Sequence, residues 1–253
     1  MKKKLFNYLN FFIACILFFG FAACNSSVPR VLVFSKTNGW RHDCIPAGKI
    51  ALKKLGDLHH FSTTFSEDST IFNPDSLKKF KAVVFFCTTL NILSDTEQNA
   101  FEKYIQSGKG FVGIHSATDT EYDWPWYTKL VGAQFVSHPK GTPTAIVQIT
   151  DRNFIANKHI PNATWQRTDE WYNYKNFNPT VNVIMNLDET SYKGGIMGAQ
   201  HPIAWYHSYD GGRAFYTGLG HTIASYSDDM FMQHLWGGIK YAMTGETGKK
   251  NTP

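Results

Sequence analysis

Residues 82–115 read AVVFFCTTLNILSDTEQNAFEKYIQSGKGFVGIH. The first six residues, 82–87, are all apolar, which is typical of a strand that is buried on both faces of a sheet. Ser94 and Glu97 form the capping box of the helix that follows. Residues 110–114 are a second short apolar run. A strand, a helix and a strand in this order predict parallel pairing through a right-handed crossover.

The same alternation precedes this stretch and continues after it. Upstream, residues 31–34 predict a buried strand, residues 45–58 a helix and residues 61–65 a weaker strand. Downstream, β patterns dominate, with expected strands over 145–149, 181–187, 202–209 and 213–217 and a closing helix over 228–243. We expect an α/β fold in three α/β/α layers, built on a doubly wound, mainly parallel sheet with extra β segments in the second half.

The N-terminus has the layout of a secretory signal peptide. Three lysines, Lys2 to Lys4, precede an apolar run that ends with Ala22 and Ala23 before Cys24. This junction resembles a bacterial lipobox, with Phe21 where leucine is usual. We expect residues 1–23 to be a signal peptide, 24–29 a tether lipidated at Cys24, 30–245 a single domain and 246–253 a polar tail. An uncleaved membrane anchor is the alternative, although the apolar run is short for a span of about 20 residues.

Composition narrows the range of partners. Removing the three lysines of the leader lowers the formal charge from +5 to +2. No stripe of lysine and arginine suggests binding to phosphate backbones, so we expect no nucleic-acid partner. Membrane contact is expected only through the lipid anchor, on the periplasmic side or at the surface, with the outer membrane favoured because Asn25 replaces the aspartate of inner-membrane retention. Cys44 and Cys87 can form one bridge or remain two buried thiols.

Three histidines follow strands of the predicted sheet. His42 comes after the first strand, His115 follows the strand over 110–114 directly, and His221 comes after the strand over 213–217. Ligands of doubly wound sheets bind outside the carboxyl ends of the strands, so these side chains should meet at one edge. The other histidines of predicted helical or flanking segments, such as His234, are interpreted as structural.

Residues 113–117, Gly-Ile-His-Ser-Ala, have the form of a nucleophile elbow with a histidine at its apex. Histidine is a poor acyl acceptor but a good general base or metal ligand. We expect the side chain of His115 to point out of the sheet into the crevice. Ser116 is one residue away from the apex and is not favoured as a nucleophile.

Acids and aromatic residues follow the elbow in an order that suits a sugar, because carboxylates accept hydrogen bonds from hydroxyls and flat rings cover the apolar face of a pyranose. The alternative is that the rings belong to the core and the acids cap turns. We take Asp119 and Glu170 as catalytic candidates together with His42, His115 and His221. The candidates for substrate binding are Trp40, Arg41, Trp124, Trp126, His138, Asp169 and Tyr172.

At six motifs the chain resembles the ThuA-like family, named for trehalose utilisation, of the class I glutamine amidotransferase-like superfold. The motifs are residues 37–42 (TNGWRH), 113–119 (GIHSATD), 132–139 (GAQFVSHP), 169–172 (DEWY), 202–205 (PIAW) and 212–221 (GRAFYTGLGH). The resemblance implies a flavodoxin-like, amidotransferase-like sheet and a role with disaccharides or keto-sugars. Amidotransferase relatives carry a cysteine at the elbow, so His115 argues against glutaminase activity. A nucleotide cofactor is not expected.

Two functional hypotheses follow. The first is an exported carbohydrate-processing enzyme, a glycoside hydrolase, lyase or sugar isomerase, that acts on a disaccharide, glycoside or keto-sugar by histidine acid/base chemistry. In a variant of this hypothesis, some of His42, His115, His221 and the acids hold a divalent metal ion. The second is a non-catalytic sugar-binding lipoprotein, which needs the aromatic residues but not the histidines.

The lipobox interpretation yields a direct prediction. A Cys24→Ala chain lacks the sulfur that accepts the lipid, so it should appear in the soluble fraction after cell lysis and lose the mass of the lipid. The unsubstituted chain should sediment with membranes in the same preparation. Membrane retention of Cys24→Ala would instead support the uncleaved anchor.

Overall fold

The computed structural model describes residues 28–249, so the predicted signal peptide, Cys24 and the end of the polar tail lie outside the described residues. The strands and helices in chain order are β1 (Arg30–Phe34), α1 (Ile45–His59), β2 (Ser62–Ser66), α2 (Pro74–Leu77), β3 (Ala82–Phe86), α3 (Asp95–Gln106), β4 (Gly110–Ile114), α4 (Pro125–Val131), β5 (Gln134–Ser137), β6 (Thr144–Ile149), β7 (Thr164–Thr168), β8 (Asn173–Lys175), β9 (Asn182–Asp188), β10 (His201–Tyr209), β11 (Gly212–Thr217) and α5 (Asp229–Thr244).

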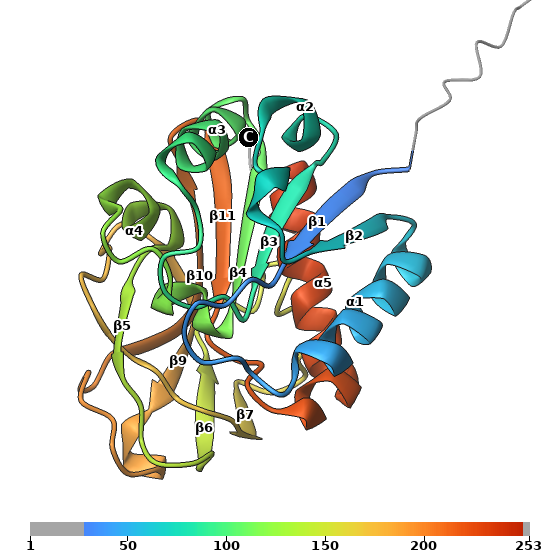
Figure 1. Cartoon of the computed structure of the whole chain (residues 1–253). Coiled ribbons are helices and arrows are strands. Elements are labelled where there is room, and N and C mark those ends of the chain that lie inside the picture. Colours follow the sequence, from blue (N-terminus) through green and yellow to red (C-terminus); the bar gives the residue numbers. More distant parts are fainter. Residues whose placement is uncertain (1–27, 250–253) are drawn as a thin grey trace, which may run out of the picture.

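A nine-stranded sheet in the order β2-β1-β3-β4-β11-β10-β9-β6-β7 forms the centre of the molecule (Figure 1). The pairs from β2 to β11 are parallel, which confirms the predicted doubly wound core. The pairs from β11 to β7 are antiparallel, and these strands are the extra β segments of the second half. The sequence did not predict three strands: β7, at the edge of the large sheet, and the short β5 and β8, which pair separately.

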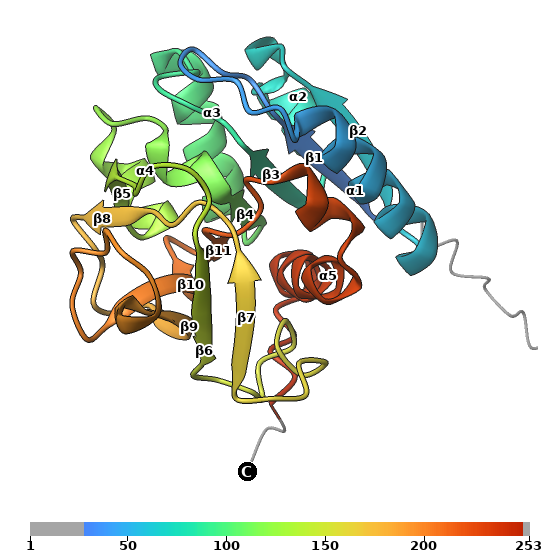
Figure 2. The ribbon, with the colours of Figure 1, turned by 90° about the horizontal axis from the view of Figure 1, so that it is seen from below.

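Helices cover both faces of the parallel part (Figure 2), with α1 and α5 on one face and α3 and α4 on the other. The alternation of side chains along β3 explains this layering. Phe85 packs on Phe101 of α3 and Tyr127 of α4, whereas the next residue, Phe86, lies against Gly48 of α1. A Cβ atom at Gly48 would lie 2.2 Å from the Phe86 ring, so glycine lets α1 approach the sheet closely.

Helix α3 begins as the sequence predicts. Both halves of the capping box between Ser94 and Glu97 are present, so the first backbone donors of the helix are satisfied. Behind them, the buried carboxylate of Glu121 accepts hydrogen bonds from the backbone N–H groups of Ile92 and Leu93, at 2.7 and 2.8 Å. This contact ties the loop after β3 to the segment after the elbow. Within residues 28–249, no helix has the length and apolarity needed to cross a bilayer.

His234 of α5 has the structural role that the sequence predicted for it. Its ring is fully buried, with Nδ1 3.1 Å from the Ala156 carbonyl oxygen and Nε2 3.1 Å from Thr217 Oγ1. The Nδ1–H group therefore donates to Ala156, and Nε2 accepts from the hydroxyl. Burial, helped by the charge of His159, lowers the pKa of His234 to about 3.

This pKa predicts a loss of stability in acid. Between the unfolded histidine pKa of about 6.5 and the folded value, the unfolded chain binds a proton that the folded chain does not, so the free energy of unfolding falls as pH falls, by at most about 1.4 kcal/mol per pH unit for this group. In urea unfolding at pH 7 and pH 5, His234→Gln should show a smaller pH dependence than the unsubstituted protein. Equal pH dependences would contradict the assignment.

Candidate functional site

The three edge histidines meet. His42 lies on the loop after β1, His115 is the first residue after β4, and His221 follows β11. The ring centroids are 4.9 Å apart for His42 and His115, 5.2 Å for His42 and His221, and 5.0 Å for His115 and His221. His42 and His115 are buried and His221 is partly exposed. The rule that parallel strands direct their carboxyl ends to one edge thus brings together residues that are far apart in sequence.

His115 occupies the apex of a sharp turn. Its backbone has φ 52°, in the left-handed region that residues with side chains seldom adopt. Gly113 is required before it, because a Cβ atom there would lie 2.9 Å from Tyr216. The Tyr216 hydroxyl donates to the His115 carbonyl oxygen at 2.6 Å and holds the turn. The imidazole is directed toward His221 and Glu170, but its neighbours cover it fully, so it lies behind the pocket lining and not in the crevice that the sequence predicted.

Glu170, which follows β7, completes the cluster. Its Oε2 lies 3.3 Å from both His115 Nε2 and His221 Nδ1, and its Oε1 lies 3.2 Å from His138 Nδ1. Burial alone would raise the pKa of Glu170, but the hydrogen bonds and charges of His115 and His221 bring it well below its ordinary value. Burial also lowers the pKa of His221, and there the hydrogen bond to Glu170 prevails, so the net pKa is raised.

The hydrogen-bond pattern leaves room for a cation among these groups. His115 Nδ1 lies 3.1 Å from the Gly218 carbonyl oxygen, to which it donates, so a neutral His115 presents the lone pair of Nε2 to Glu170. Lone pairs 3.3 Å apart repel each other unless a proton or a metal ion lies between them. Metal-binding histidines usually donate their other ring N–H group to a carbonyl or carboxylate oxygen, as His115 does to Gly218.

The spacing agrees with a metal site. One ligand atom from each of His42, His115, Glu170 and His221 lies within 4.8 Å of all the others. A tetrahedral zinc site with bonds of about 2.0–2.1 Å separates its ligands by about 3.3 Å. The distances of 3.1 Å from His115 Nε2 to His221 Nδ1, and of 3.3 Å from each to Glu170 Oε2, match this edge length.

His42 is the fourth member and is held neutral. Burial, followed by the charges of His115 and His221, lowers its pKa to about 3. Its Nδ1 is buried without a hydrogen-bond partner in the described part of the chain. A neutral imidazole with an unpartnered nitrogen is the form in which histidine binds a metal ion.

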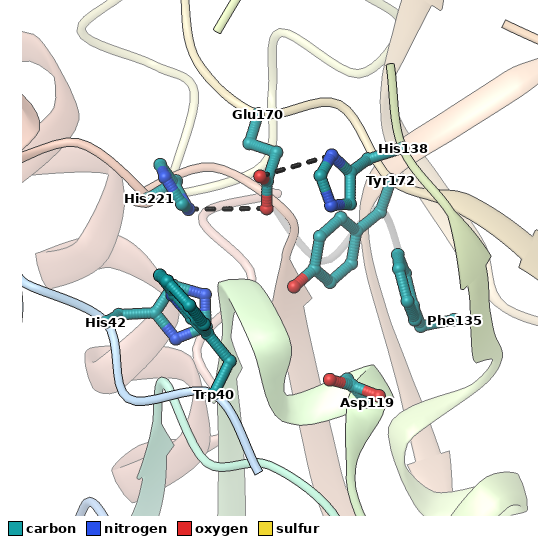
Figure 3. Close-up of a pocket in the computed structure, with 8 residues that line it drawn as sticks. All are labelled: Trp40, His42, Asp119, Phe135, His138, Glu170, Tyr172 and His221. Carbon is teal, nitrogen blue, oxygen red and sulfur yellow. Dashed lines mark ion pairs between the residues drawn. The ribbon is translucent and has the colours of Figure 1, made fainter. Parts of the chain in front are cut away.

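Three members of the cluster, His42, Glu170 and His221, line a pocket of about 370 Å³ (Figure 3), within the range of small-molecule sites. Its lining residues are Trp40, His42, Asp119, Phe135, His138, Glu170, Tyr172 and His221. Trp40 is 70% exposed, which is unusual for a tryptophan without a partner surface. Across residues 28–249, no lysine or arginine belongs to this lining.

Asp119 lies across the pocket from Glu170 (Figure 3) and ends the short 3-10 turn that starts at His115. The Tyr122 hydroxyl donates to its Oδ1. Burial raises the pKa of Asp119, and the hydrogen bond from Tyr122 offsets the rise only in part. The two carboxylates of the pocket thus differ in proton affinity, as is common for acid and base partners in enzymes.

Four of the predicted sugar-binding residues lie outside the pocket lining. Trp124 is buried beside α3 and donates to Glu102, and Trp126 donates to Asp210, because Pro125 starts α4 and turns both rings away. Arg41 is held by Glu67 in a two-pronged ion pair, with distances of 2.9 and 3.0 Å. Asp169 is the fourth, and its role is described below. Trp40, His138 and Tyr172 do line the pocket.

Asp169 is a positioning residue beneath the site. Its buried carboxylate accepts from the backbone N–H groups of Glu170, Gly220 and His221, at 3.1, 2.8 and 3.0 Å. Arg167 Nε lies 3.3 Å from Asp169 Oδ2 and supplies the compensating charge. A single carboxylate therefore fixes the two loops that carry Glu170 and His221.

Sequence reasoning did not select Phe135, which lines the pocket from β5 and packs on Tyr172 with ring centroids 4.2 Å apart. The residue lies within the motif over 132–139, but nothing in the pattern distinguishes it from a core phenylalanine. The pairing of β5 with β8, which brings Phe135 beside Tyr172, is not visible in the sequence.

Comparison with known proteins identifies relatives. The family model described as ThuA, trehalose utilisation, matches residues 30–242. A ThuA-like protein from Bacteroides uniformis superposes with a TM-score of 0.74 at 20% identity over 90% of this chain and 99% of that chain. A ThuA-like protein from Parabacteroides merdae superposes with a TM-score of 0.68 at 18% identity over 88% of this chain and 93% of that chain.

Similarity to a β-galactosidase is limited to the fold. The β-galactosidase from Bacillus circulans sp. alkalophilus matches with a TM-score of 0.52 at 12% identity, over 90% of this chain but 33% of its own length. No curated protein matches in sequence. The family model covers most of the chain, and the fold agrees with the class I glutamine amidotransferase-like superfold. The chain therefore belongs to the ThuA family, a membership that points to carbohydrate utilisation.

Proposed function

We propose that this protein is a metal-dependent enzyme that processes an uncharged disaccharide, glycoside or keto-sugar by acid/base chemistry. The observation that carries the proposal is the convergence of His42, His115, Glu170 and His221, from four separate segments, beside an aromatic-lined pocket that His42, Glu170 and His221 line and His115 supports from behind. A purely structural cluster would not need an adjoining cavity. Export as a lipoprotein facing the periplasm or the cell surface is part of the same proposal and rests on the leader sequence.

The pocket suits a sugar. Trp40 on one side, and Phe135 with Tyr172 on the other, offer apolar faces to a pyranose ring, while Asp119 and His138 can hydrogen-bond its hydroxyls. The lining has no lysine or arginine among residues 28–249, which disfavours phosphorylated or acidic sugars. Family membership in carbohydrate utilisation agrees with this substrate class.

The histidine cluster and Asp119 would have different roles in the reaction. A divalent ion on the three histidines and Glu170 would supply Lewis-acid polarisation of a sugar oxygen. Asp119 faces the pocket from the opposite side, and its pKa, which burial raises above the ordinary carboxyl value, suits a role in proton transfer. Tyr122 orients Asp119 by donating to Oδ1, which leaves the other oxygen for the substrate.

A glycosidase with two free carboxylates is less well supported. Such an enzyme needs both carboxyl groups to face the scissile bond. Glu170 is engaged by His115, His138 and His221, and its lowered pKa prevents it from acting as a general acid. Proton transfer beside a polarised carbonyl or glycosidic oxygen fits these contacts better.

Turnover measurements should distinguish the proton-transfer residue Asp119 from the proposed metal ligands. On a panel of plain and 3-keto disaccharides and glycosides read by mass spectrometry, Asp119→Asn should lose about 10²–10⁴-fold in rate while keeping its metal. His115→Ala should lose both the turnover and the bound metal. Because His115 is fully buried and its Nδ1–H group donates to the Gly218 carbonyl oxygen, this variant should also lose about 1–3 kcal/mol of stability.

The matched control is His60→Asn, since His60 is exposed and its φ of 58° is a conformation that asparagine tolerates. His234 is buried and would confound rate with stability. Unchanged turnover in Asp119→Asn would remove the acid/base role. Sugar binding that survives loss of all three edge histidines, with no turnover on any substrate, would favour the non-catalytic sugar-binding lipoprotein.

Metal content is an independent prediction. Protein purified without chelator should carry about one divalent ion per chain, as measured by inductively coupled plasma mass spectrometry. Glu170→Gln and His42→Ala should weaken metal binding, because each removes one of the four proposed ligands. His60→Asn should bind as the unsubstituted protein does. Far less than one equivalent of metal, with activity intact, would exclude the metal-dependent mechanism.

A further inference from the structure

Two cysteines meet directly beneath the histidine cluster. Cys44 immediately precedes α1, and Cys87 immediately follows β3. Both are fully buried free thiols, and their Sγ atoms are 3.6 Å apart. The turn that places Cys87 there has φ 51°, an unfavourable conformation for a residue with a side chain.

The sulfur atoms contact the site from behind. Cys44 Sγ lies 3.4 Å from the Gly220 carbonyl oxygen, and Gly220 directly precedes His221. Cys44 itself is two residues after His42. The thiol pair therefore contacts the loops that carry His42 and His221, and neither thiol takes part in the proposed chemistry of the pocket.

We propose that Cys44 and Cys87 are a reversible redox-modification site, which an organic disulfide converts to an intramolecular bridge that restrains the His42 loop. The thiolate of one cysteine attacks a sulfur of the oxidant and expels one thiolate, which forms a mixed disulfide. The second protein thiolate attacks the protein sulfur of that adduct and expels the other thiolate. Two protein thiols lose two protons and two electrons, and one oxidant becomes two thiols.

The bridge requires movement in the site. The sulfurs must approach by about 1.5 Å, from 3.6 Å to the roughly 2.05 Å of a disulfide. The start of α1 and the end of β3 share this displacement, and His42 is two residues from one end of it. Metal–ligand bonds stay within about 0.2 Å of their standard lengths, so a shift of the loop that orients His42 should weaken ion binding in the bridged form, by about 10–100-fold. This consequence rests on the proposed metal site, whereas formation of the bridge does not.

The test uses the purified protein and 4,4′-dithiodipyridine, a small organic disulfide. After reaction under native conditions and alkylation of the remaining thiols, trypsin should yield residues 42–49 linked to residues 82–103, and the pair should be two hydrogens lighter than the sum of the free peptides. Hydrogen exchange over residues 36–45 should slow in the bridged form. Dithiothreitol should restore the original peptides and the original exchange.

Cys44→Ala and Cys87→Ala are the controls, and either one suffices if the other fails to fold. Each should give a pyridyl adduct or no reaction, with unchanged exchange over residues 36–45. Recovery of only pyridyl adducts from the unsubstituted protein, or thiols that react only after denaturation, would overturn the proposal. A bridge that leaves hydrogen exchange unchanged would also overturn it. A protein that binds no metal but forms the bridge with slowed exchange would refute the metal site alone.

Discussion

The left-handed turn at His115 is the constraint on which the site depends. The chain leaves β4 at φ 52°, Gly113 makes room for Tyr216, and the Tyr216 hydroxyl fixes the carbonyl of the strained residue. Backbone strain of this kind costs about 1–3 kcal/mol and persists only when its surroundings hold it. Here it directs one imidazole nitrogen to the Gly218 carbonyl and leaves the other facing Glu170 and His221.

Around this residue, buried carboxylates hold the backbone that carries the remaining groups. Asp169 satisfies three backbone donors of the Glu170 and His221 loops, and Glu121 satisfies two in the loop after β3. Charge-assisted bonds of this type are stronger than neutral ones, and an unpaired buried donor is costly. The pocket is thus assembled on a rigid frame, as metal sites and catalytic sites require.

The sequence predicts the site best where a pattern of strands and helices fixes the position of residues in the fold. Alternating strands and helices predict parallel strands, whose carboxyl ends share an edge, and this alone brings His42, His115 and His221 together. Closeness in sequence to the elbow is a weaker predictor of which residues line the pocket. Trp124 and Trp126 follow the elbow closely, yet Pro125 starts a helix that turns both away. Asp169 and Glu170 are adjacent and both buried, yet Asp169 accepts from backbone N–H groups whereas Glu170 contacts imidazoles. The partners come from distant segments, so local pattern cannot predict this difference.

The claim that three imidazoles and one carboxylate share a single ion is tested most directly by X-ray absorption spectroscopy of the zinc-loaded protein. The account predicts a first shell of nitrogen and oxygen ligands at about 2.0–2.1 Å, with the multiple-scattering features of three histidine rings. A spectrum with one imidazole or none, typical of an ion held by water and surface carboxylates, would contradict it.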